Sequence, residues 1–266
     1  MKLHLGCGRT LLEDWVNVDM SFPWGSNMRP EGSPTFVRYN LDSGKNMPWP
    51  TDSVDQVYGS HVIEHLHNPL AMMQQLWRVC KPGAIAVFEC PYGSSDDADE
   101  DPTHVRRVFP ASFQYFGQPY YWRADYGYTG DWQVQVVELE VPGQLLQAVG
   151  EKGVITRITH GRNFVLQQRA YLECIKPRRA PDKDLQVPTA ISLVPVRADG
   201  WTSDDGVDRL PAPDLGSDQL ATEGDSSSED QHNGPPNLLV VDLSEDEQTI
   251  HSRPEAKDAG DDSSGL

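Results

Sequence analysis

Residues 3–8, LHLGCG, and residues 15–19, WVNVD, decide how this chain folds. The first stretch is a short apolar strand that runs into a glycine turn, and the second is an apolar strand that ends in a carboxylate. Gly6 and Gly8 allow a tight turn and a close backbone approach to a ligand, because neither has a Cβ atom. Asp19, at the end of the second strand, can accept hydrogen bonds from both hydroxyls of a ribose. Together these features indicate a nucleoside-type ligand on an open α/β sheet.

The charge of the chain is distributed unevenly. The 266 residues carry 22 basic and 40 acidic side chains, for a formal net charge of −18. Residues 1–176 hold 15 basic and 20 acidic side chains, whereas residues 177–266 hold 7 and 20. An acidic surface repels duplex nucleic acid and anionic membrane, so nucleic acid is an unlikely partner and no membrane association is expected. The absence of a ~20-residue apolar run and the lack of close cysteine pairs favour a cytoplasmic protein with reduced thiols.

Strand and helix patterns alternate through the first 90 residues. Short apolar runs predict strands at residues 2–5, 16–19, 35–40, 54–58 and 84–90. Between the last two, apolar residues at helical spacing predict a helix over 63–79, which ends at Pro82 and Gly83. This order predicts a doubly wound, mostly parallel, Rossmann-like sheet of seven strands.

Residues 91–132 form an aromatic insert that is too long for a plain connector. Two interpretations are compatible: a satellite core packed on the sheet, or a lid and acceptor pocket over the strand ends. Beyond the insert, the pattern predicts a strand over 135–141 and a helix over 142–149. Strands at 153–160 and 164–176, joined by a turn at 161–163, would then close the sheet as an antiparallel hairpin.

The composition changes after Lys176. We therefore expect one folded domain over residues 1–176 and a disordered acidic tail over 177–266, rich in Pro, Asp, Ser and Gly. Within the tail, residues 237–247 join an apolar run to an acidic flank. This segment is either a solvated piece of tail or a peptide that adds a strand to a protein partner. It is similar to a SUMO-interacting motif.

A set of motifs in one order carries a family resemblance. These motifs are Leu3–Gly8, Asp19, Asn40–Asp42, Met47–Trp49, Asp52–Tyr58, Ser60–Leu66 and Arg78–Cys90. Together they resemble the class I S-adenosylmethionine-dependent methyltransferases of the type-11-like, small-molecule sort. The resemblance implies methyl transfer from S-adenosyl-L-methionine to an O or N atom of a small-molecule or sugar-like acceptor.

The resemblance also assigns the cofactor-binding residues. The turn residues Leu5, Gly6, Cys7 and Gly8 would hold the methionine part, and Asp19 the ribose. Leu41 would flank the adenine and Asp42 would accept from its amino group. Ser60 and His61 would face the transferred methyl group.

Two departures from the family pattern stand out. His4 occupies the position where the family has an acid, and no third glycine follows Gly8. These departures leave a second interpretation open, in which the protein is not catalytic, binds S-adenosylmethionine and recruits a partner through its acidic tail. A dinucleotide-dependent oxidoreductase fits poorly, since it would need Gly-x-Gly-x-x-Gly.

The candidate catalytic bases are histidines, because imidazole titrates near neutral pH. They are His61, His65 and His104. The run from His61 to His65 also matches the H-x-x-E-H pattern of zinc metalloproteases, although its place after a strand argues against that class. We assign no metal site from the sequence, but divalent metal binding by Glu64, His65 and His104 stays open.

Overall fold

The computed structural model describes residues 1–23, 31–196 and 239–240. Its described residues form one mixed sheet in the order β3-β2-β1-β4-β5-β7-β6-β8-β9. The strands are β1 (Lys2–Leu5), β2 (Val16–Asp19), β3 (Phe36–Arg38), β4 (Val54–Ser60), β5 (Cys80–Pro91), β6 (Trp132–Pro142), β7 (Gln167–Cys174), β8 (Ala190–Val196) and β9 (Leu239–Val240). Strands β1 to β5 are mutually parallel, and β7 runs antiparallel between β5 and β6. The predicted mostly parallel α/β sheet is confirmed.

Helix α1 (Pro69–Val79) begins later than the sequence pattern predicted. The Asn68 side chain accepts a hydrogen bond from the Ala71 N–H, and Pro69 occupies the first turn, where its missing N–H costs nothing. Residues Ile63–His65 instead form a separate 3-10 helix, η2. The expected single helix over 63–79 is therefore wrong in its first third.

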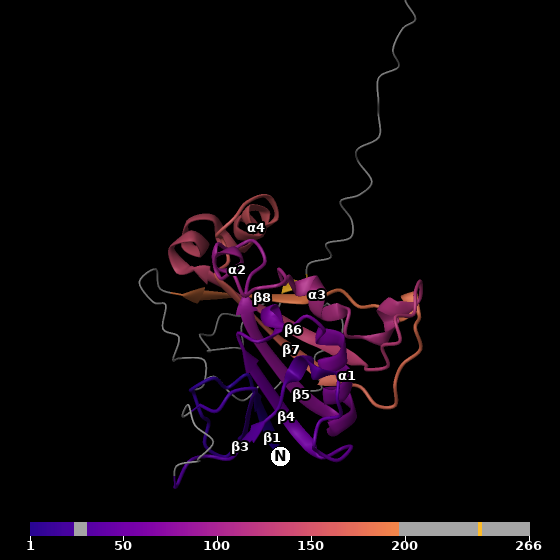
Figure 1. The fold of residues 1–266 in the computed structure, drawn as a ribbon. Helices are drawn as coiled ribbons and strands as arrows, with labels where there is room; N and C mark the ends of the chain where they lie inside the picture. The colour runs from indigo at the N-terminus through magenta and orange to yellow at the C-terminus, as the bar shows by residue number, and fades with distance from the viewer. Residues whose placement is uncertain (24–30, 197–238, 241–266) are drawn as a thin grey trace, which may run out of the picture.

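Alternating strand residues separate two hydrophobic clusters on the two faces of the sheet. Val57 belongs to the larger cluster, into which α1 inserts Met73 and Leu76. Its neighbour Tyr58 belongs to a smaller cluster with Leu12 and others. Figure 1 shows α1 lying along the strands of the sheet.

The predicted antiparallel hairpin at the end of the domain is wrong. Residues Gly143–His160 form the helix α4, which is interrupted at Gly150 by a backbone with φ 66°. Among strands β1 to β8, the antiparallel strand is β7, reached through α4 and the turn after it. Val154 is buried, so the β-branched run that resembled a strand packs one side of a helix onto the sheet.

The folded domain extends past the predicted boundary at residue 176. Strand β8 pairs in parallel with β6, and Leu239–Val240 pair antiparallel with β8. The tail assigned to 177–266 therefore begins no earlier than residue 197. Apart from Leu239–Val240, the suggested partner motif at 237–247 lies outside the described residues, as do 197–236 and 248–266. No helix in the described segments combines the length and apolar character needed to cross a bilayer.

Candidate functional site

The glycine turn, the acid after β2 and the end of β4 meet at one edge of the sheet. Leu5 pairs with Val18 on one side and with Gly59 on the other. The carboxyl ends of these parallel strands therefore lie next to one another, which is where open α/β sheets bind ligands.

The two glycines of the turn serve different purposes. Both have left-handed backbones, with φ 58° at Gly6 and 52° at Gly8. A Cβ atom on Gly6 would lie 2.2 Å from Cγ2 of Val62, so this glycine lets the loop after β4 pack against the turn. A Cβ atom on Gly8 would meet nothing within 4 Å. The open side of the turn is therefore at Gly8.

The side chains of the remaining turn residues do not face a ligand. Leu5 is fully buried, and the Cys7 side chain is buried as well. Burial raises the pKa of the Cys7 thiol to about 12, with the Asp19 carboxylate adding to the shift. Cys7 is therefore a protonated core side chain and not a nucleophile.

Asp19 is connected directly to the glycine turn. Its Oδ2 accepts a hydrogen bond from the Gly8 N–H at 3.0 Å, and its Oδ1 accepts one from the Ser21 N–H at 2.8 Å. Each carboxylate oxygen can accept two hydrogen bonds and accepts one from these N–H groups, so each keeps a lone pair for a hydroxyl group. The role of Asp19 in binding a ribose stays a prediction.

Asp42 already orders the chain that leads into α1. Its carboxylate accepts hydrogen bonds from the Asn68 N–H at 2.9 Å and the His67 N–H at 3.0 Å. Burial raises the pKa of Asp42, but these hydrogen bonds outweigh it and the pKa falls below its ordinary value. Oδ1 keeps one lone pair for an adenine amino group, while Leu41 is buried in the larger core.

His4, which stands in place of the family's acid, faces the interior of the sheet. Its Nδ1 lies 2.9 Å from Oδ1 of Asn17, and its ring stacks on Tyr58. Burial lowers its pKa, although the Asn17 hydrogen bond and the Asp19 charge oppose the shift. A neutral, hydrogen-bonded imidazole cannot replace the acid as a partner for a cofactor ammonium group.

His61 follows Ser60 directly at the end of β4, in a left-handed backbone with φ 53°. Its backbone N–H donates to the carbonyl of Glu89, and its Nδ1 lies 3.2 Å from Oε1 of Glu64. The Glu64 carboxylate raises the pKa of His61, against a smaller opposing effect of burial. His61 is therefore a stronger base than a free imidazole.

The other two predicted bases, His65 and His104, come together beside Glu64. Their rings make an edge contact with centroids 4.7 Å apart. Within the described residues, ligand atoms of Glu64, His65 and His104 lie within 4.8 Å of one another. This group does not include His61, so the two histidines of the H-x-x-E-H pattern do not form the ligand pair of a zinc protease.

The structure contains a cavity of about 520 Å³ that the sequence did not predict. It is lined by Tyr92, Ser94, Phe109, Pro110, Ala111, Leu139, Ile155, Ile158, Thr159, His160, Gly161, Arg162 and Ile191. Figure 1 shows α4 and α2 (Asp97–Glu100) grouped at the end of the sheet nearest β6 and β8. The cavity exists because residues 143–160 form a helix over this end, and the sequence pattern had assigned part of that helix to a strand.

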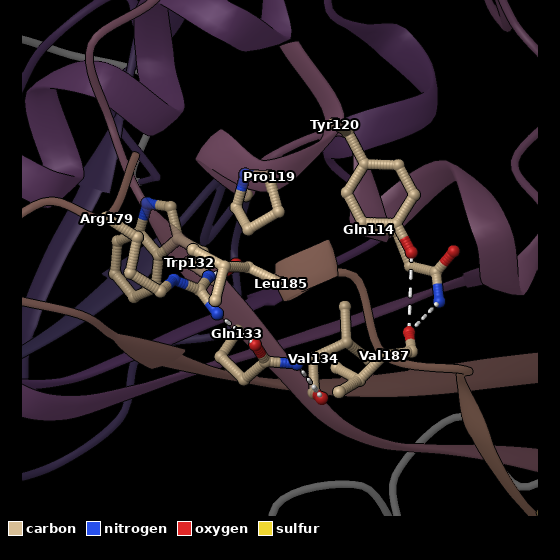
Figure 2. Close-up of a pocket in the computed structure, with 10 residues that line it drawn as sticks. Gln114, Pro119, Tyr120, Trp132, Gln133, Val134, Arg179, Leu185 and Val187 are labelled. Carbon is tan, nitrogen blue, oxygen red and sulfur yellow. Dashed lines mark hydrogen bonds between the residues drawn. The ribbon is translucent and has the colours of Figure 1, made fainter. Parts of the chain in front are cut away.

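A second pocket lies between β6 and residues 179–187. Figure 2 shows Arg179 directed at Gln133 beside Trp132, with Tyr120 and Gln114 both meeting the carbonyl of Val187. Its volume of about 10 Å³ holds roughly one water molecule. The residues that line this pocket connect the 179–187 segment to the domain. The pocket itself is too small for a substrate.

The aromatic insert contributes both to the large cavity and to the core. Tyr92 and Phe109, from its first part, line the large cavity. Phe113, Tyr128 and Trp132, from its second part, are buried in the larger core and not in a separate satellite core. A lid or acceptor-pocket role of the insert stays a prediction.

Comparisons with known proteins agree with this geometry. Residues 3–88 match a family model described as a methyltransferase domain. No match was found among curated proteins. A solved S-adenosylmethionine-dependent methyltransferase from Archaeoglobus fulgidus is 17% identical, with 65% of this chain and 85% of that chain covered and a TM-score of 0.44. The YcgJ protein from Bacillus subtilis is 15% identical, with 67% and 92% covered and a TM-score of 0.41. A methyltransferase solved in complex with the Haloferax volcanii Trm112 activator is 14% identical, with 67% and 83% covered and a TM-score of 0.42.

Residues 3–88 are therefore similar to a methyltransferase domain. The cofactor that this similarity implies is S-adenosylmethionine. The open backbone at Gly8 and the free lone pairs of Asp19 fit the methionine and ribose parts of that cofactor. His4 is the one position that does not fit, because it is turned inward to Asn17.

Proposed function

We propose that this protein transfers the methyl group of S-adenosylmethionine to an O or N atom of a small-molecule acceptor held in the 520 Å³ cavity. The cavity carries this proposal, because its volume lies in the range of small-molecule sites and Tyr92, which lines it, directly follows the carboxyl end of β5. Its walls are mainly aliphatic and aromatic, which favours an acceptor with an apolar body over a bare sugar.

One segment connects the cavity to the histidine cluster. Tyr92 and Phe109 line the cavity, and between them the Val105 N–H donates to the backbone carbonyl of Glu64 at 2.9 Å. The segment between two cavity-lining residues therefore also contacts the residues that follow β4. Arg162, also in the lining, is already ion-paired with Asp96 and Asp99.

The chain's own residues would position the reactants and manage one proton. The sulfonium supplies an electrophilic methyl group, and in-line transfer depends mainly on the alignment of the two reactants. A hydroxyl acceptor must also lose its proton, and His61 is the base best placed to take it. Its raised pKa comes from Glu64, which would stabilise the imidazolium that forms.

A non-catalytic, cofactor-binding regulatory protein is the second candidate function. The observation that favours it is the inward orientation of His4, which removes one familiar contact for the cofactor's amino group. In that case the cofactor would bind, but no acceptor in the cavity would be methylated.

The test measures binding and turnover separately. Calorimetric titration of the full chain with S-adenosylmethionine and S-adenosylhomocysteine measures cofactor binding, and a panel of apolar phenols, amines and carboxylic acids measures methyl release. Ile158→Trp fills the cavity, whereas Thr156→Trp adds the same side chain at an exposed position of α4.

We expect both variants to bind the cofactor and only Ile158→Trp to lose turnover. Equal turnover by the two variants would place the acceptor elsewhere. Cofactor binding without methyl release to any acceptor would favour the regulatory function. The four cysteines, all buried and free, agree with action in the reducing cytoplasm.

A further inference from the structure

Glu64 is a buried carboxylate whose charge is not balanced by hydrogen bonds. The residue is 2% exposed, and neither of its carboxylate oxygens has a hydrogen-bond partner in the described part of the chain. His61 Nδ1 approaches Oε1 to 3.2 Å but without hydrogen-bond geometry. Burying a carboxylate that accepts no hydrogen bond is costly, and a cation beside Glu64 would offset that cost in addition to the His61 imidazole.

Two imidazoles lie within reach of this carboxylate. His104 Nε2 is 4.0 Å from Oε1 of Glu64, and the His104 side chain is itself buried. His65 brings a second ring, so that one ligand atom from each of the three residues falls within 4.8 Å of the others. Asp101, whose Oδ2 is 3.9 Å from His104 Nε2, places another carboxylate at the rim.

The hydrogen bonds behind the two imidazoles select their Nε2 atoms as ligands. His104 Nδ1 lies 3.3 Å from the carbonyl of Ala98. His65 Nδ1 lies 3.0 Å from the hydroxyl of Thr103 and 3.3 Å from its carbonyl. An Nδ1–H that donates to such oxygens fixes the tautomer and leaves the Nε2 lone pair free, as in metal-ligating histidines.

We propose that Glu64, His65 and His104 bind a divalent transition-metal ion. Two imidazoles and one carboxylate suit Zn²⁺ or Mn²⁺, whereas Mg²⁺ and Ca²⁺ prefer ligand sets made of oxygen. Three protein ligands leave a coordination position open for water or for an oxygen of a bound molecule. Glu64 follows the end of β4 by four residues, and its backbone carbonyl accepts from the Val105 N–H, four residues before the cavity-lining Phe109.

The test is metal binding by the full chain, with neither cofactor nor acceptor present. Protein stripped by a chelator is titrated with Zn²⁺ by calorimetry and with Mn²⁺ by electron paramagnetic resonance. We expect one ion per chain, and at least a 10-fold loss of affinity in Glu64→Gln and in His104→Gln. His160→Gln, an exposed histidine outside the group, is the matched control and should bind as the wild type does.

A second readout distinguishes lost ligands from lost folding. Saturating Zn²⁺ should raise the thermal midpoint of the wild type, because the ion binds the folded state, and should leave that of Glu64→Gln unchanged. If stripped wild type binds neither ion, or if Glu64→Gln binds both as tightly as the wild type, the metal site does not exist. Neither result bears on methyl transfer, which is measured in the separate experiment above.

Discussion

The backbone N–H of Gly8 donates a hydrogen bond to the carboxylate of Asp19 across the ends of β1 and β2. The turn that would hold the methionine part and the acid that would hold the ribose are therefore one rigid unit. Their relative position is set before any ligand arrives, which lowers the entropy that binding must overcome.

Asp19→Asn should weaken S-adenosylmethionine binding by about 10- to 100-fold, because charged hydrogen bonds contribute roughly 1.5–3 kcal/mol. The variant keeps one side-chain oxygen, so we expect the fold to survive. Asp125→Asn is the control: its Oδ1 accepts from the Gly127 N–H, as that of Asp19 accepts from Ser21. Calorimetry that finds equal affinities for the two variants would remove Asp19 from the cofactor site.

Gly6→Ala should destabilise the domain more than Gly8→Ala does. Both positions impose the left-handed backbone penalty of about 1–2 kcal/mol, but only the new methyl at residue 6 collides with Val62. We expect an extra cost of about 1–3 kcal/mol at residue 6 in urea unfolding. Val62→Ala should recover part of it, and a double variant no more stable than Gly6→Ala would show that Val62 is not the obstacle.

Arg169 and Glu89 form a buried ion pair in the sheet, and Tyr58 donates to the same carboxylate at 2.6 Å. Arg169→Met should cost about 3–5 kcal/mol, because it leaves Glu89 charged and buried without its cation. Adding Glu89→Gln to the Arg169→Met variant should restore a large part of the lost free energy of unfolding. A double-mutant cycle measures the coupling, and additive losses would mean that the two residues act independently.

His4 should make the domain less stable in mild acid. Its pKa is lowered in the folded state, so between that value and about 6.5 the unfolded chain binds more protons. The stability contributed by neutral His4 is complete above about pH 6.5 and is lost as the pH falls toward the lower folded pKa. Urea unfolding at pH 7.5 and 5.5 should show a smaller difference for His4→Gln than for the wild type. His160→Gln should keep the wild-type difference, and an unchanged difference in His4→Gln would contradict the assignment.

The first five strands could be predicted from the sequence because each is a short apolar run of the length a buried parallel strand needs. The start of α1 was predicted wrongly: Asn68 and Pro69 form a recognisable cap, but the apolar spacing of residues 63–66 extended the predicted helix too far. The position of Asp19 beside the glycine turn could also be predicted, because an acid that ends a parallel strand lies beside the turn of its neighbour.

The rest depended on contacts that local sequence does not encode. Val154 and Ile155 have the β-branched pattern of a strand, and packing over the sheet decides in favour of a helix. Ala190–Val196 forms a strand although the sequence on either side of it is polar, because it pairs with β6. The meeting of Glu64 with His104 requires the insert to fold back by 40 residues, which no spacing rule predicts.

The place of β7 in the sheet sets the order in which this protein can assemble during synthesis. Strands β1 to β5 find their neighbours as soon as they leave the ribosome, because each pairs with a strand already made. β6 has no partner until β7 has been translated, because it pairs with neither β5 nor any earlier strand. The part of the fold that forms the large cavity therefore completes last, and a nascent chain stopped before residue 167 would have its cofactor edge but an unpaired β6.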